Sequence, residues 1–235
     1  MKIKKVLFGM MLSGLLLSVM IVPVFAANPT TTNLSANNWR VFNIDTSVPK
    51  LWDINKAEAL SNGGVEFPFQ TSTTGGAWVG TGWFSVYLKT NYNVDLTGET
   101  ITANVDVVAS TGTLFWTRTS ACANTGTDAY VRLEFQSATG NYDASDYWWS
   151  TNSLNLSTLA TSGTATLLSA STDGANWTNL NGQSGITDSA GFADALKNVK
   201  EIGVAFGSSC SFASGVNVSG GKASFQLNSF KVTEN

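Results

Sequence analysis

The chain of 235 residues contains no histidine. Catalysis by Ser-His-Asp or Cys-His groups is therefore excluded, as is zinc bound through imidazole. Charged residues are also scarce, at 12% of the chain, with 13 basic against 16 acidic side chains and no basic cluster after residue 26. Because binding to phosphates needs Lys and Arg, we expect no nucleic-acid partner.

Metal-binding motifs are missing as well. The acidic residues are scattered, and no loop of the D-x-D-x-D-G type occurs. We therefore expect no cofactor and predict no metal ligand. A structural calcium ion held by backbone carbonyls and one or two acids at strand ends stays open, because no motif reports such a site.

A single long apolar run exists, from Val6 to Val22, preceded by Lys2, Lys4 and Lys5. It is followed by Val24-Phe25-Ala26, which suits signal-peptidase cleavage, so residues 1–26 are predicted to be a signal peptide. The alternative is an uncleaved membrane anchor, since the run is nearly long enough to span a bilayer. We expect a secreted or cell-surface-associated protein without membrane contact after cleavage.

Cysteine is limited to Cys122 and Cys210. In an oxidising extracellular setting, an even pair most simply forms one disulfide, so we predict a Cys122–Cys210 bond. Residues 27–38 are predicted to be a flexible polar segment. Residues 39–235 show no linker or repeat and are long enough for a single domain with a sizeable core.

Apolar and polar residues alternate in many short segments separated by Gly, Asn and Ser. This pattern predicts an all-β protein, an antiparallel β-sandwich with jelly-roll topology. One short connecting helix is expected at Ser189–Lys197, and a β-bulge near Asn228–Ser229. The predicted strands are 39–44, 64–70, 77–90, 99–109, 113–118, 129–137, 164–171, 201–207 and 222–232.

Two of these segments combine an apolar side with an unusual second side. In WFSVYLK (83–89) and YVRLEFQ (130–136), the second side mixes aromatic rings with charged and amide groups. Rings with Arg, Glu and Gln suit stacking on sugar rings and hydrogen bonds to hydroxyls. TLFWTR and SDYWWS extend the candidate ligand-binding face, which comprises Trp83, Tyr87, Trp116, Arg118, Tyr130, Arg132, Glu134, Asp146 and Trp148.

Two alternatives compete with a binding face. The aromatic rings could pack in the core or under loops, while the charged residues form a lattice of ion pairs on a solvated sheet. Glycoside hydrolysis would need two carboxyl groups, and Glu134 and Asp146 are the acids expected on this face. Neither the E-x-D-x-E strand of laminarinase-like enzymes nor the paired-glutamate strands of small xylanases occurs, so no catalytic residue is assigned.

Three strings carry a resemblance to a known class of proteins: SDYWWS (145–150), FADALKNVKEIGVAFG (192–207) and ASFQLNSFKV (223–232). From residue 130 to 232 the chain resembles secreted jelly-roll proteins of the carbohydrate-binding-module type. The resemblance implies the fold, and none of the strings is a ligand-binding signature.

The first hypothesis for function is non-catalytic binding of a polysaccharide or cell-surface glycan. The second is a structural protein of the cell surface or extracellular matrix that associates with copies of itself. The third is a secreted glycoside hydrolase that uses Glu134.

Overall fold

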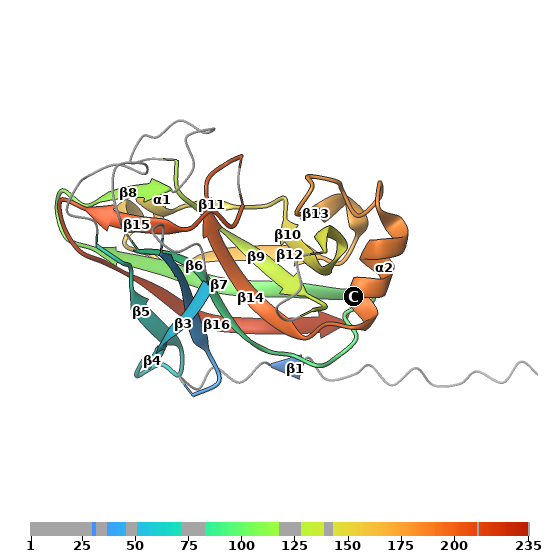
Figure 1. Ribbon diagram of the computed structural model, residues 1–235. Helices are drawn as coiled ribbons and strands as arrows, with labels where there is room; N and C mark the ends of the chain where they lie inside the picture. The colour runs from blue at the N-terminus through green and yellow to red at the C-terminus, as the bar shows by residue number, and fades with distance from the viewer. Residues whose placement is uncertain are drawn as a thin grey trace, which may run out of the picture.

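Two antiparallel sheets packed face to face form the molecule (Figure 1). The computed structural model describes residues 30–31, 37–45, 51–71, 83–117, 128–138, 143–210 and 212–234. The two facing sheets confirm the predicted all-β sandwich of jelly-roll type. Arg118, Cys122 and the predicted signal peptide lie outside the described residues, so the Cys122–Cys210 disulfide and a role for Arg118 stay predictions.

The smaller sheet has six strands, and β16 at its centre pairs with β7, β5 and β1. The register of β16 shifts between Leu227 and Ser229, which confirms the β-bulge predicted there. The strands are β12 (Thr166–Ser171), β7 (Glu99–Ala109), β16 (Ala223–Glu234), β5 (Val65–Pro68), β4 (Glu58–Ala59) and β1 (Thr30–Thr31).

The larger sheet has ten strands and carries most of the predicted binding residues. Along its main path it contains β13 (Trp177–Asn179), β10 (Tyr147–Ser150), β9 (Tyr130–Gln136), β14 (Glu201–Gly207), β6 (Trp83–Asn91), β15 (Val216–Ser219) and β8 (Leu114–Thr117). Beside this path, β11 (Leu154–Asn155) pairs with β9, and β2 (Arg40–Asp45) pairs with β6 and β3 (Leu51–Lys56).

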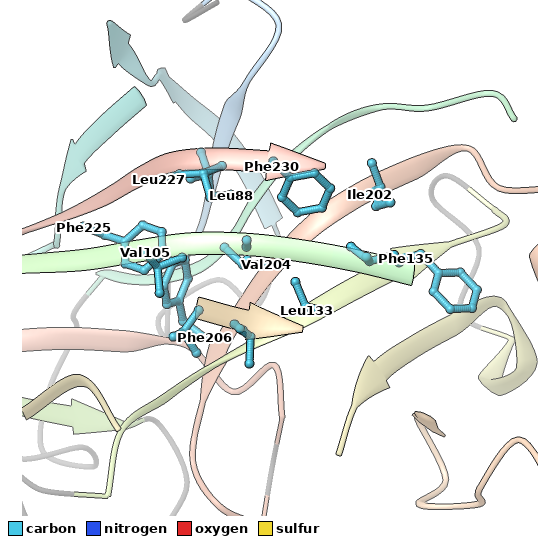
Figure 2. Close-up of a cluster of buried hydrophobic side chains, with 14 of the residues drawn as sticks. Leu88, Val105, Leu133, Phe135, Ile202, Val204, Phe206, Phe225, Leu227 and Phe230 are labelled. Carbon is cyan, nitrogen blue, oxygen red and sulfur yellow. The ribbon is translucent and has the colours of Figure 1, made fainter. Parts of the chain in front are cut away.

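The core fills the space between the two sheets. Figure 2 shows Val105, Phe225 and Leu227 of the smaller sheet pointing toward Leu133 and Val204 of the larger one. All five are at most 2% exposed. Burial of this apolar surface is the main stabilising contribution to the sandwich.

Two α-helices are described where one was predicted. The helix α2 (Ser189–Lys197) has the expected bounds, and Asp188 is its N-cap. The helix α1 (Leu156–Ser162) was not predicted, because its seven residues are rich in Ser and Thr and show little helical periodicity of apolar residues. Its N-cap is Asn155, whose side chain accepts a hydrogen bond from the Thr158 amide.

Short 3-10 turns, η1 (Ala144–Asp146) and η2 (Gly174–Asn176), precede β10 and β13. None of the helices in the described part of the chain has the length and apolar character that a membrane crossing requires.

Candidate functional site

The outer face of the larger sheet, which is the side turned away from the core, carries a row of charged and aromatic side chains. Because paired residues share a face, the register places Trp149, Glu134, Gly203, Lys89 and Arg40 side by side on five adjoining strands. The residues that alternate with them, such as Leu133, Val204 and Leu88, belong to the core.

Small residues occupy the middle of this face. Gly203 separates Glu134 from Lys89, and Ala205 separates Arg132 from Tyr87 in the next row. A Cβ atom at Gly203 would meet the Leu88 carbonyl oxygen at 2.2 Å. The central strand β14 therefore leaves room for the large side chains on both sides of it.

Lys89 is held in one position by several contacts. Its ammonium nitrogen lies 2.6 Å from the Glu201 carboxylate, which also accepts a hydrogen bond from the Gln136 amide. The same nitrogen lies 4.4 Å from the centre of the Phe42 ring and 5.0 Å from that of Tyr87. Cation–π contacts and the ion pair together fix this charge on the outer face.

Glu134 is 0% exposed and sits next to this ion pair. Burial raises the pKa of its carboxyl group to about 8, Lys89 acts in the opposite direction, and the nearby Glu201 adds to the rise. Glu134 is therefore neutral at pH 7, and its carboxyl group can donate as well as accept a hydrogen bond.

Arg132 lies one row away from Glu134 and is also buried. Desolvation lowers the pKa of its guanidinium group, whereas the charges of Tyr130 and Asp128 act to raise this pKa. Its Nη1 donates to the carbonyl oxygen of Thr151 at 3.1 Å, and the Phe212 ring centre lies 4.5 Å from its Cζ. The loop after β14 thus covers this part of the outer face.

Several buried polar atoms of the outer face have no hydrogen-bond partner among the described residues. Most buried polar groups in folded proteins are paired with protein groups or with ordered water, so these atoms mark positions where a hydrogen-bond partner is expected. The atoms are Arg132 Nε, Glu134 Oε1 and Oε2, Gln136 Oε1, Trp149 Nε1 and Asn217 Oδ1.

A polar cleft of about 370 Å³ adjoins the outer face at the Lys89–Glu201 ion pair. Its size lies within the range of small-ligand sites. It is lined by Asn37, Asn38, Arg40, Lys89, Thr90, Asn91 and Glu201.

Five of the predicted face residues do lie on the outer face. Tyr87, Arg132 and Glu134 form its buried centre. Tyr130 is half-buried beside Arg132, with 6.0 Å between the ring centre and the guanidinium carbon. Trp116 is half-buried at the far edge, on β8, where its indole nitrogen donates to the Ser219 hydroxyl at 2.7 Å.

Trp148 and Asp146 do not belong to this face, which corrects the prediction. Trp148 is 0% exposed and packs in the core against Phe192, with ring centres 4.7 Å apart. Its neighbours Tyr147 and Trp149 occupy the outer face in its place. Asp146 lies in η1, before the strand begins, and accepts a hydrogen bond from the Ser137 hydroxyl.

Trp83 is separated from Tyr87 by a β-bulge that alternation could not show. The register of β6 against β2 skips Val86, and both Val86 and Tyr87 pack on the outer face. Ser85 pairs with the core residue Val216 and so faces inward. Trp83 lies two residues before Ser85 and so has the same parity, which is opposite to that of the outer face. It is 37% exposed because it stands at the end of the strand.

Sequence reasoning left out five residues of the site: Lys89, Gln136, Tyr147, Trp149 and Glu201. Lys89 and Gln136 show the alternation that selected their neighbours, and Glu201 begins a strand whose outward positions are Gly, Ala and Gly. The alternation of Lys89 and Gln136 could therefore have identified these two residues. The Gly and Ala residues on the outer face of β14 gave no reason to place that strand in the middle of a site.

Comparisons with known proteins find similarity at the level of solved structures. No protein-family description matches the chain, and no curated protein matches it. A solved xylan-binding module of the type called CBM15 aligns with 85% of this chain and 96% of its own, at 14% identity and a TM-score of 0.41.

A second solved structure is a xylanase, Xylanase10C from Cellvibrio japonicus, in complex with xylopentaose. It aligns with 84% of this chain at 13% identity and a TM-score of 0.35, and the alignment spans 28% of the xylanase chain. At such identities and TM-scores, neither likeness assigns a ligand or an activity to this protein.

Proposed function

We propose that this protein is a secreted, non-catalytic carbohydrate-binding protein that recognises a polysaccharide through the outer face of its larger sheet. The observation that carries the proposal is the run of unpaired hydrogen-bonding groups at Arg132, Glu134, Gln136 and Trp149. A polysaccharide offers many hydroxyl groups, each of which can both donate and accept a hydrogen bond.

Aromatic rings on the same face supply the apolar part of the recognition. The half-buried Trp116, Tyr130 and Phe42 present ring surface on which sugar rings stack. Arg132, Gln136 and Glu134 are buried beneath this face, so their side chains bond to hydroxyls only after the covering side chains have moved. Because Phe212 covers Arg132, its ring has to move before a sugar reaches the guanidinium group.

Retention on a panel of insoluble polysaccharides tests the proposal. The panel comprises cellulose, xylan, mannan and chitin, and the variants are Trp116→Ala and Gln136→Leu. Thr102→Ala, on the outer face of the other sheet, is the matched control. We expect the wild type and the control to be retained on at least one polysaccharide and the two face variants to be released.

Two results would reject carbohydrate binding at this face. One is a wild type that passes through every matrix. The other is retention that Trp116→Ala and Gln136→Leu leave unchanged.

One observation favours a second candidate, a glycoside hydrolase. Glu134 is protonated at neutral pH, whereas Glu201 on the neighbouring strand pairs with the Lys89 ammonium group. Two carboxyl groups in contrasting surroundings suit an acid and a nucleophile or base. Release of reducing sugar from the panel, abolished in Glu134→Gln, would establish this activity, and no turnover by the wild type would dismiss it.

A further inference from the structure

Three polar side chains meet where β9, β14 and β6 run side by side. The Lys89 ammonium nitrogen lies 2.6 Å from Oε2 of Glu201, and the Gln136 amide nitrogen donates to the same oxygen atom. The register explains the meeting, because Glu201 pairs with Gln136 and lies two residues before Gly203, which pairs with Lys89. An amine and a carboxamide are therefore neighbours around one carboxylate oxygen.

This cluster is shielded from water. Gln136 is 1% exposed, and the side chains of Lys89 and Glu201 are 6% and 13% exposed. The rings of Phe42 and Tyr87 lie against the ammonium group, as the cation–π contacts show. In such surroundings a proton passes between groups in direct contact, and little water competes for it.

The space between the lysine and the glutamine is free of a side chain from the strand that separates them. Gly203 pairs with Lys89 on one side and with Glu134 on the other. A Cβ atom at Gly203 would meet the Lys89 Cβ at 2.9 Å. The glycine therefore lets the lysine side chain cross β14 toward β9.

We propose that Lys89 and Gln136 form an intramolecular amide bond, with the Glu201 carboxylate as the proton carrier. Lys89 Nζ gives a proton to Glu201 and attacks Cδ of Gln136, so that a new C–N bond forms. The bond from Cδ to the original amide nitrogen then breaks. Glu201 carries two protons from Nζ to the released nitrogen, which leaves as an ammonium ion. The reaction needs no oxidant, reductant or further reactant.

The carboxamide of Gln136 is a better target for the amine than the carboxylate of Glu201. A carboxylate is negatively charged and resists attack by an electron pair, whereas a carboxamide is neutral. Amides react slowly with amines in solution, but groups held in the reacting geometry reach effective concentrations on the order of 10⁵ M or more. Fixed contact in a dry site thus replaces the activation that the amide lacks.

Glu134 supports the same reaction from the neighbouring position on β9. It lies two residues before Gln136 on the same face, and its carboxyl group is neutral at pH 7. Neither its two oxygens nor Oε1 of Gln136 has a hydrogen-bond partner among the described residues. A neutral carboxyl group here can donate a hydrogen bond to the amide oxygen as negative charge develops on it.

Mass spectrometry of the reduced and denatured protein tests the inference. Once the N-terminus has been determined, we expect the wild type to be lighter than its calculated mass by one molecule of ammonia. Trypsin should fail to cleave after Lys89, and peptide mapping should find one branched peptide that joins the segments containing Lys89 and Gln136. The result is read from the chain alone, so it does not depend on whether the protein binds a polysaccharide.

Matched variants separate the three roles. Lys89→Arg keeps a cation beside Glu201 without a nucleophilic amine, and Gln136→Leu removes the target, so both should have the full calculated mass. Glu201→Gln removes the proton carrier and should form the bond on the order of 100-fold more slowly. Gln226→Leu is the control, because Gln226 donates to Glu66 on the other sheet, and it should keep the loss of ammonia.

Four outcomes overturn the inference. One is a folded wild type that keeps its full calculated mass after prolonged incubation. The others are loss of water with Lys89 joined to Glu201, loss of ammonia that maps to another residue, and loss of ammonia that persists in Lys89→Arg. The mass and peptide map of the wild type decide between these outcomes and the proposed bond even where a variant fails to fold.

Discussion

Glu134 and Lys89 both pair with Gly203, so a carboxyl group and an ammonium group flank a position without a side chain. Lys89 nevertheless makes its ion pair with Glu201, at 2.6 Å. Glu134 is thereby left buried with a desolvation cost for its ionised form that Lys89 offsets only in part, and burial raises its pKa to about 8. This arrangement sets the pH dependence of stability and the hydrogen-bonding character of the face.

The pH dependence of unfolding should reveal the buried carboxyl group. Its ordinary pKa is 4.5 and its folded value is about 8. The folded state holds the proton more tightly, so the contribution of Glu134 to stability is complete below pH 4.5 and is lost as pH rises through 8. The free energy of unfolding should fall by about 1.4 kcal/mol per pH unit within this window.

The variant Glu134→Gln mimics the protonated form and should remove that slope. Urea unfolding at several pH values measures the difference between wild type and variant, with the exposed Glu58→Gln as control. A difference that stays constant from about pH 5 to 8 would show that Glu134 ionises normally.

Gly203→Ala should destabilise the fold. The added Cβ would meet the Leu88 carbonyl oxygen at 2.2 Å and the Lys89 Cα at 2.7 Å. Both are backbone atoms, so relieving the clash requires the strand β6 itself to shift. We expect a loss of about 1–3 kcal/mol, the usual cost of overpacking. Chemical denaturation measures it, and stability equal to the wild type would mean that β6 and β14 can separate freely.

Trp116 and Trp148 should respond differently to replacement by alanine. Trp148 is fully buried in the core, so Trp148→Ala should cost about 3–5 kcal/mol of folding free energy. Trp116 is half-buried at the edge of the outer face, so Trp116→Ala should change stability by less and weaken polysaccharide retention. Differential scanning fluorimetry with affinity electrophoresis separates the two effects. Similar unfolding temperatures for both variants would contradict these placements.

The Lys89–Glu201 pair should be worth more than a surface ion pair. Its side chains are 6% and 13% exposed, so removing one partner leaves a poorly solvated charge. We expect Glu201→Gln to cost about 3 kcal/mol. A double-mutant cycle with Lys89→Met measures the coupling, and a coupling near zero would show that solvent replaces the pair.

Strict alternation made part of the fold readable from the sequence. In β7, Ile101, Ala103, Val105 and Val107 are buried, as their parity predicted, because no bulge interrupts that strand in its pairing with β12. The helix α2 and the bulge near Asn228 were readable for the same reason, since each changes the period of the apolar pattern.

Other features depend on what a strand packs against. In SDYWWS both sides carry large aromatic rings, so parity separated Trp148 from Trp149 without telling which one faces the core. In β6 the skipped residue Val86 is apolar, as an inward residue would be, so the bulge left no trace in the pattern.

The sequence by itself determined that this is an all-β chain with aromatic and charged side chains on one side of several strands, because side-chain direction alternates along every extended segment. Only the tertiary structure decided which side is covered, that Lys89 pairs with Glu201 and not Glu134, and that a polar cleft opens beside them. Those contacts join strands far apart in the chain. They depend on register and on the small residues of β14, which alternation within a single strand does not report.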